Sequence, residues 1–237
     1  NGSNAGSAVT NGSGIATLNS IGLVGINVGT YPGGAGSGVG ASFAGDSTSL
    51  ASSDTDTLTI NKRPITVTAI ADTKVYDGTT ASTKVPTITL GSLAGSDTAA
   101  WTQSFDTKNI GAGKTLTPAG SVSDGNGGNN YDVIFVDVTG NITTRLLTVT
   151  ATGIDKVYDG TLAATVGLLD DRIAGDIFTI TYNTAAFLDP NVGNGKTVNV
   201  SGISISGGTD AGNYLLGNTS ASTTANITQA SQTITII

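Results

Sequence analysis

The sequence contains no cysteine, no histidine, no methionine and no glutamate, so all 17 of its acidic residues are aspartate. The absence of cysteine excludes disulfide bonds and thiolate nucleophiles. The absence of histidine removes the commonest general base and metal ligand. Without glutamate as well, only Ser–Lys or Asp–Asp arrangements are left as catalytic sets. We therefore predict that the chain is not an enzyme.

Charge is scarce and mostly of one sign. Charged residues make up 11% of the chain, and its formal net charge is −7. This balance provides no basic surface for phosphate backbones or anionic lipid, so we expect no nucleic-acid partner. Apolar runs are only a handful of residues long, whereas a membrane-spanning helix needs ~20. We therefore expect no membrane span in this segment.

What is abundant is glycine, at 34 of 237 residues, together with short alternating or β-branched runs. Gly, Asp, Asn and Ser clusters bound these runs, which is typical of strands joined by tight turns. No window has the spacing of an amphipathic helix. We predict an all-β fold, an elongated array of tandem immunoglobulin-like β-sandwich modules of about 82 residues, each with about six to eight strands.

The chain repeats itself at an interval of 82 residues. The run Lys-Val-Tyr-Asp-Gly-Thr at 74–79 recurs identically at 156–161, and the Asn-Ile-Gly that starts at Asn109 is matched by Asn-Val-Gly at Asn191. An Asn-Tyr pair occurs late in each copy, at 130–131 and 213–214. This interval disfavours a parallel β-solenoid, whose coils are shorter, although residues 1–46 show no clear period and leave that alternative open there.

The repeat predicts four segments. Residues 63–145 and 146–229 are expected to be the first and second full modules. Residues 1–62 are expected to be the rear part of an incomplete module, and residues 230–237 the opening strand of a following one. The chain is thus expected to be an excerpt from a longer array.

We interpret the repeated hexapeptide as a structural motif. The tyrosine is predicted to be a core anchor whose hydroxyl reaches a backbone carbonyl, and Asp-Gly is predicted to form a turn. The alternative is a sugar platform, in which the ring stacks on a sugar and the carboxylate accepts hydroxyl groups. The residues concerned are Lys74, Tyr76, Asp77, Gly78 and Thr79, and Lys156, Tyr158, Asp159, Gly160 and Thr161.

The hexapeptide, the Asn-Ile/Val-Gly motif and the Asn-Tyr pair closely resemble the YDG-type and related glycine-rich stalk repeats of bacterial haemagglutinin-like adhesins. The resemblance implies an extracellular or cell-surface location, no catalytic residue, and a role as stalk or spacer in cell adhesion or biofilm matrix. Its expected partners are neighbouring modules of the same chain. Two alternatives remain: repeats that hold extracellular polysaccharide or host-surface glycan, and a homopolymer in which residues 230–237 complete a neighbouring copy by donor-strand addition.

No cofactor is expected, and one metal hypothesis is kept as an alternative. Aspartates in turn-like contexts could supply oxygen ligands for calcium between modules, although no stretch matches a calcium-binding loop. Turn capping is the competing interpretation. The residues are Asp54, Asp56, Asp124, Asp170, Asp171, Asp176, Asp189 and Asp210.

Overall fold

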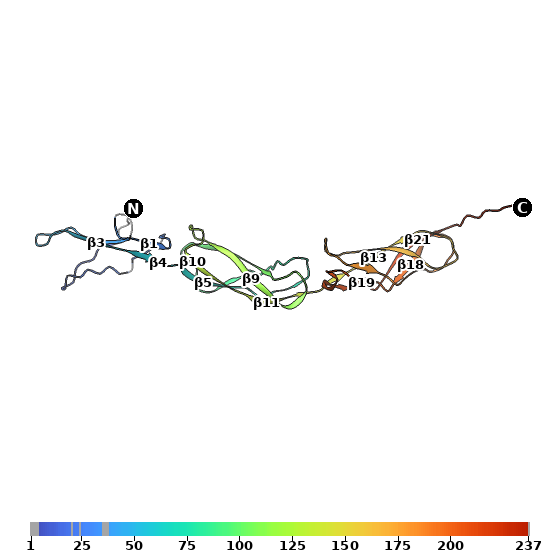
Figure 1. The fold of residues 1–237 in the computed structure, drawn as a ribbon, viewed down its shortest axis with the longest axis horizontal. Coiled ribbons are helices and arrows are strands. Elements are labelled where there is room, and N and C mark those ends of the chain that lie inside the picture. The colour runs from blue at the N-terminus through green and yellow to red at the C-terminus, as the bar shows by residue number, and fades with distance from the viewer. Residues whose placement is uncertain (1–4, 20, 24, 35–37, 237) are drawn as a thin grey trace. The chain divides into compact units, whose positions relative to one another are not determined.

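The structure is a computed structural model that describes residues 5–19, 21–23, 25–34 and 38–236. In these residues the regular structure is strand throughout, apart from one turn of 3-10 helix at Ala211–Asn213 (Figure 1). The all-β prediction is confirmed. In the same residues no helix has the length and apolar character needed to cross a bilayer. The immunoglobulin-like sandwich remains a prediction.

The described chain forms two compact units. The first comprises Asn1–Ile70, Val85–Thr102 and Pro118–Asp137; the second comprises Ala71–Lys84, Gln103–Thr117 and Val138–Ile237. The second unit therefore holds part of the predicted first module together with all of the predicted second one. Strands β8 (Thr98–Phe105) and β9 (Gly111–Ser123) contribute residues to both units.

The first unit contains two antiparallel two-stranded sheets and a three-stranded sheet. The antiparallel pairs are β1 (Gly29–Tyr31) with β4 (Leu58–Ile60), and β2 (Val39–Phe43) with β3 (Ser52–Asp56). The sheet has the order β10-β5-β7, formed by β10 (Tyr131–Val136), β5 (Arg63–Thr68) and β7 (Thr87–Leu90). Strands β10 and β5 run parallel, whereas β5 and β7 are antiparallel.

Alternation along β5 builds the core of the first unit. Ile65 and Val67 are at most 1% exposed, while the threonines between and after them face outward or are half-buried. Val122 and Tyr131 complete this buried cluster. The period-two pattern of the sequence therefore marks the face that packs inward.

The second unit contains two four-stranded sheets with equivalent strand orders. The first has the order β6-β11-β9-β8, with β6 at Thr73–Val75 and β11 at Val138–Thr143. The second has the order β14-β21-β18-β17, formed by β14 (Lys156–Val157), β21 (Ser220–Thr228), β18 (Gly193–Ser201) and β17 (Thr184–Phe187). The remaining pairs are β12 (Arg145–Leu147) with β20 (Tyr214–Leu216), β13 (Val149–Ile154) with β15 (Thr165–Asp170), and β16 (Thr179–Thr181) with β19 (Ser204–Ser206).

Strand registers repeat with the period seen in the sequence. Gly111 pairs with Ile142 and Gly193 with Ile227, and the same pairing occurs earlier between Gly29 and Ile60. The parallel pairs repeat as well, because Tyr131 lies opposite Arg63 as Tyr214 lies opposite Arg145. The antiparallel pair of β1 and β4 therefore has the register of the rear of a module. The exact module boundaries remain predictions.

Residues 229–236 do not form a strand in this structure. Ile234 and Ile236 are 88% and 93% exposed, and Ile237 lies outside the described residues. A strand requires a hydrogen-bonded neighbour, so alternating sequence alone does not fix one. The expectation of an opening strand at 230–237 is therefore not met here, and it stays conditional on a pairing partner.

Candidate functional site: the hexapeptide loops and the module junction

The first hexapeptide folds around the ammonium group of Lys74, at the end of β6. Its Nζ donates to Asp77 Oδ1 at 2.8 Å, to the Thr79 carbonyl at 2.8 Å and to the Ala81 carbonyl at 2.8 Å. Asp77 Oδ1 also accepts from the Thr79 backbone N–H and hydroxyl, both at 2.9 Å. One lysine and one aspartate thus satisfy most polar groups of the turn locally.

The second hexapeptide, at the end of β14, has the same geometry. Lys156 Nζ donates to Asp159 Oδ1 at 2.8 Å, to the Thr161 carbonyl at 2.8 Å and to the Ala163 carbonyl at 2.9 Å. The hydrogen bonds from Lys156 and Thr161 lower the pKa of Asp159 to about 2. Burial would raise the pKa of Asp77, but hydrogen bonds from Lys74 and Thr79 outweigh it and the pKa falls. The hexapeptide therefore forms the same hydrogen-bonded loop in both modules.

The two tyrosines have different surroundings. Tyr76 is fully buried, whereas Tyr158 is 43% exposed. The Tyr76 hydroxyl donates to the carboxylate of Asp176, at 3.0 Å from Oδ1 and 2.9 Å from Oδ2. We predicted a backbone carbonyl as its acceptor; the structure instead has a side chain of the following module, which lies 100 residues further along the chain.

Asp176 is the centre of this junction, and its side chain is only 3% exposed. It accepts a second hydroxyl hydrogen bond from Tyr214, at 2.6 Å. Lys108 Nζ lies 3.1 Å from Asp176 Oδ1 and 2.9 Å from Asp210 Oδ1. A buried carboxylate with two hydroxyl donors and an ammonium partner is well compensated for its desolvation.

The electrostatics favour a charged carboxylate and neutral phenols. Burial would raise the pKa of Asp176, but hydrogen bonds from Tyr214, Lys108 and Tyr76 outweigh it and the pKa falls below its ordinary value. Burial and the hydrogen bond to Asp176 raise the pKa of Tyr214 to about 12. Burial likewise raises the pKa of Tyr76. Hydrogen bonds to Asp210 and Asp176 raise the pKa of Lys108. At neutral pH the network therefore consists of a charged carboxylate, a charged ammonium and two neutral phenols.

Packing supports the polar contacts of the junction. The Tyr76 and Tyr214 rings meet edge to face, with centroids 5.5 Å apart. The turn that presents Asp176 is closed by a hydrogen bond from its N–H to the Ile173 carbonyl at 3.1 Å, and the Ile173 N–H donates to the Tyr214 hydroxyl at 2.8 Å. Tyr214 thus holds both the carboxylate and the turn that carries it.

An asparagine pair forms the other half of the junction. Asn213 Nδ2 donates to Asn109 Oδ1 at 3.1 Å, and Asn213 Oδ1 accepts from the Ile110 N–H at 3.0 Å. The first unit contains the same arrangement. There, Asn130 Nδ2 donates to Asn27 Oδ1 at 3.1 Å, and Asn130 Oδ1 accepts from the Val28 N–H at 2.8 Å. This asparagine clamp therefore occurs twice.

Sequence reasoning identified both asparagine motifs as marks of the repeat but did not bring them together. The signal that could have paired them is their joint recurrence, because each Asn-Tyr pair follows the Asn-Ile/Val-Gly of the previous copy by 103 or 104 residues. Lys108 and Asp210 gave no such signal. The first is replaced by Pro190 in the next copy, and the residue equivalent to the second is not an aspartate.

The aspartates proposed for calcium have other partners in this structure. At the junction, the positive charge between Asp176 and Asp210 is the ammonium of Lys108. Asp170 pairs with Arg172 at 2.6 Å, and Asp189 with Lys196. Among residues 5–19, 21–23, 25–34 and 38–236, no group of three or more acidic side chains is placed to hold a metal ion.

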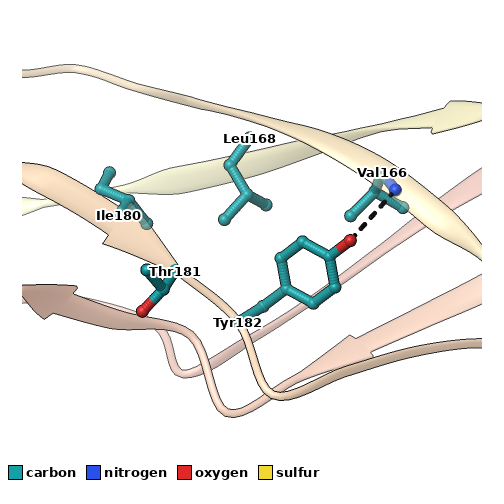
Figure 2. A pocket seen from close by; sticks show the side chains of 5 residues that line it. All are labelled: Val166, Leu168, Ile180, Thr181 and Tyr182. Atoms are coloured by element: carbon teal, nitrogen blue, oxygen red, sulfur yellow. Dashed lines mark hydrogen bonds between the residues drawn. The ribbon is translucent and has the colours of Figure 1, made fainter.

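A shallow depression lies in the second module, with a volume of about 370 Å³. Three of its five lining side chains are aliphatic, and the Tyr182 hydroxyl accepts from the Val166 N–H at 3.5 Å (Figure 2). Sugar sites combine such a surface with several convergent polar groups. The lining residues offer only two hydroxyls; they are Val166, Leu168, Ile180, Thr181 and Tyr182. The depression therefore gives little support to the glycan hypothesis.

Comparison with protein families gives a match to the YDG domain at residues 61–140 and again at 143–233. These segments cover well over half of the chain and lie within a few residues of the predicted full modules. Comparisons with curated proteins and with solved structures gave no match.

Proposed function

Because the chain belongs to the YDG domain family, we propose that it is a structural stalk or spacer segment of a secreted or surface-exposed bacterial adhesin. The observation that carries this proposal is the junction of Tyr76, Lys108 and Asp176. A spacer must limit the movement of each module against the next. Buried, charge-assisted hydrogen bonds restrict that movement through their distance and direction requirements.

Two further features support a structural role. The hexapeptides use their charged groups within their own turns, so the most distinctive motif of the chain holds the fold together. The sequence also lacks the side chains from which most catalytic sites are built. In this proposal the partners of each module are its neighbours in the chain, and adhesion itself belongs to other parts of the protein.

Spin labels test the stiffness that this function requires. The chain has no cysteine, so Thr117→Cys and Asn199→Cys create two unique labelling sites at exposed strand positions of the second unit. We expect a narrow distance distribution between the labels, and a broader one after Asp176→Asn. The matched control is Asp97→Asn, because Asp97 accepts the Tyr131 hydroxyl within the first unit. A distribution in the parent as broad as in the Asp176→Asn chain would contradict the spacer function.

The proposed location has its own test. A membrane-impermeant maleimide applied to intact cells that produce the Thr117→Cys protein is expected to label it without lysis. Labelling that requires lysis would contradict a surface location. Maleimide labelling does not depend on the spin-label distances, so the proposed location and the proposed stiffness are tested separately.

A second candidate function is a subunit that polymerises by donor-strand addition. It is favoured by residues 229–236, which form no strand and expose Ile234 and Ile236 almost completely. An unpaired β-branched segment is suited to completing the sheet of another copy. Electron microscopy and light scattering with and without residues 230–237 test this. Filaments that disappear on truncation support it, and a monomer unaffected by truncation excludes it.

A further inference from the structure

The second module carries an exposed copy of the surface that the first module uses at the junction. On the first module this surface consists of Tyr76, Gly78, Asn109 and Ile110; on the second, the equivalent residues are Tyr158, Gly160, Asn191 and Val192. Tyr158 and Val192 are 43% and 47% exposed. We call this second set the Tyr158 face.

We propose that the Tyr158 face is a docking surface for a further YDG-type module, one that presents an aspartate carboxylate to the Tyr158 hydroxyl and an asparagine side chain to Asn191 and the Val192 N–H. The partner is identified by this chemistry, because Asp176 and Asn213 make those contacts with the first module.

The loop that carries Tyr158 is already in the conformation used at the junction. Every hydrogen bond from Lys156 matches the corresponding bond from Lys74 to within 0.1 Å. The glycines that follow have φ values of 77° at Gly78 and 76° at Gly160. Docking therefore needs no rearrangement of the loop, which lowers the entropic cost of binding.

The surface near the two tyrosines differs where the first hexapeptide meets the following module. A Cβ built on Gly78 would lie 2.9 Å from the Cγ2 atom of Ile173, whereas one built on Gly160 meets nothing within 4 Å. By contrast, the preceding valines are equally exposed, at 55% for Val75 and 57% for Val157. The difference at the tyrosine and the glycine is therefore not shared by the valine that precedes them.

The asparagine half of the contact supports the inference independently. It occurs in both units with nearly equal distances, although Lys108 is replaced by Ile26 in the earlier copy. The clamp thus forms without that lysine. The Tyr158 face has Pro190 at the same position, so we expect it to hold its partner through the tyrosine and asparagine contacts alone.

This inference rests on the spacer function, because a spacer requires the contact to recur from module to module. Its failure is nevertheless distinguishable. The spin-label experiment reports on the contact made by Tyr76, whereas the experiment below reports on Tyr158 only.

The test is the full chain with residues 144–228 inserted a second time between Thr228 and Gln229. This places the inserted copy behind Tyr158 with the same linker that joins the two existing modules. The inserted copy carries Y158F, so Tyr158 of the original second module is the residue that is followed. The readout is the rate of tyrosine nitration by tetranitromethane, measured on peptides by mass spectrometry.

We expect Tyr158 to react readily in the parent chain and at least tenfold more slowly in the extended chain, as slowly as Tyr76. Introducing Asp176→Asn and Asn213→Ala into the inserted copy should restore most of the reactivity. A Tyr158 rate unchanged within twofold would overturn the proposal. An inserted copy that fails to fold, revealed by rapid nitration of its own Tyr214, would also overturn it, since the same sequence folds behind Tyr76.

Discussion

The two hexapeptide loops have one sequence, one backbone conformation and one set of internal hydrogen bonds, yet their tyrosines differ completely in exposure. Tyr76 is fully buried against the following module, and Tyr158 is 43% exposed. The comparison separates what the motif does by itself from what a neighbour adds. Lys74 and Lys156 fold the turn in either case. Burial of the tyrosine depends on Asp176 and Tyr214.

This separation explains why one short motif can serve a tandem array. The turn preorganises the tyrosine before any neighbour is present, so contact with the next module does not have to order the loop. The neighbour then contributes a carboxylate and an aromatic edge. Folding within a module and docking between modules are thus encoded by different atoms of the same hexapeptide.

The largest expected effect comes from removing the buried ring. Y76A should destabilise the chain by about 3–5 kcal/mol, as for other buried aromatic side chains. It also leaves Asp176 without one hydroxyl donor. Y158A, the matched control, should cost less than about 1 kcal/mol because its ring is exposed. Urea unfolding of the full chains measures both. Equal losses would show that burial at the junction contributes nothing.

The second-largest effect is expected from alkaline pH, which should lower the stability that the junction contributes. Tyr214 has a pKa of about 12 in the fold against about 10 when unfolded, and the pKa values of Tyr76 and Lys108 are raised as well. The contribution of Tyr214 to stability is complete below its unfolded pKa of ~10 and is lost as pH rises through its folded pKa of about 12, and those of Tyr76 and Lys108 are likewise lost above their unfolded pKa values. For Tyr214 this amounts to about 3 kcal/mol.

Unfolding free energies between pH 8 and 12 measure this loss. Y76F should reduce the pH dependence, because one titrating phenol has left the network. A parent chain whose unfolding free energy is flat to pH 12 would exclude the network as a source of stability. At acid pH the dependence has the opposite direction, because the unfolding free energy falls as pH is lowered. The pKa values of Asp176 and Asp210 are lowered, so their contribution is present above the unfolded pKa and falls as pH drops through the folded one.

Removing either lysine should cost the same stability, whereas the two tyrosine substitutions should cost very different amounts. K74M and K156M each remove an ammonium that donates to an aspartate, a threonine and an alanine carbonyl. Each should cost about 2 kcal/mol, typical of hydrogen bonds to a charged group, and the two losses should be equal within ~0.5 kcal/mol. Denaturant unfolding checks this. A large loss for K74M with none for K156M would mean that the turn depends on the neighbouring module after all.

The sequence predicted the parts of the molecule that depend on local pattern and repetition. The alternating runs predicted strands, as in β5, where Ile65 and Val67 form the buried face, and the Asp-Gly steps predicted turns that do have positive φ at Gly78 and Gly160. The junction could not be read in the same way. Its central contact joins Tyr76 to a residue 100 positions away, and no periodicity links a tyrosine in one copy to an aspartate in the next.

The expected strand at 230–237 illustrates the same limit. Its alternating sequence has the right propensity, but pairing is a property of two segments, and residues 229–236 remain outside any strand here. Lys108 is a similar case. It has no counterpart in the other copies, so the repeat could not single it out, although it bridges two carboxylates of the junction.

The smallest expected difference in stability loss lies between alanine substitutions at the two glycines. It measures the contact of one added methyl group with the following module. G78A and G160A both place a side chain at φ near +77°, which should cost about 1 kcal/mol in each loop. At Gly78 the new Cβ would also lie 2.9 Å from Ile173 Cγ2, whereas at Gly160 it has open space. G78A should therefore cost about 0.5–1 kcal/mol more, as overpacking does. Adding I173A removes the clashing methyl, so a double-mutant cycle should recover this excess as coupling between the two sites. Zero coupling in urea unfolding would mean that Ile173 does not press on the Gly78 turn in solution.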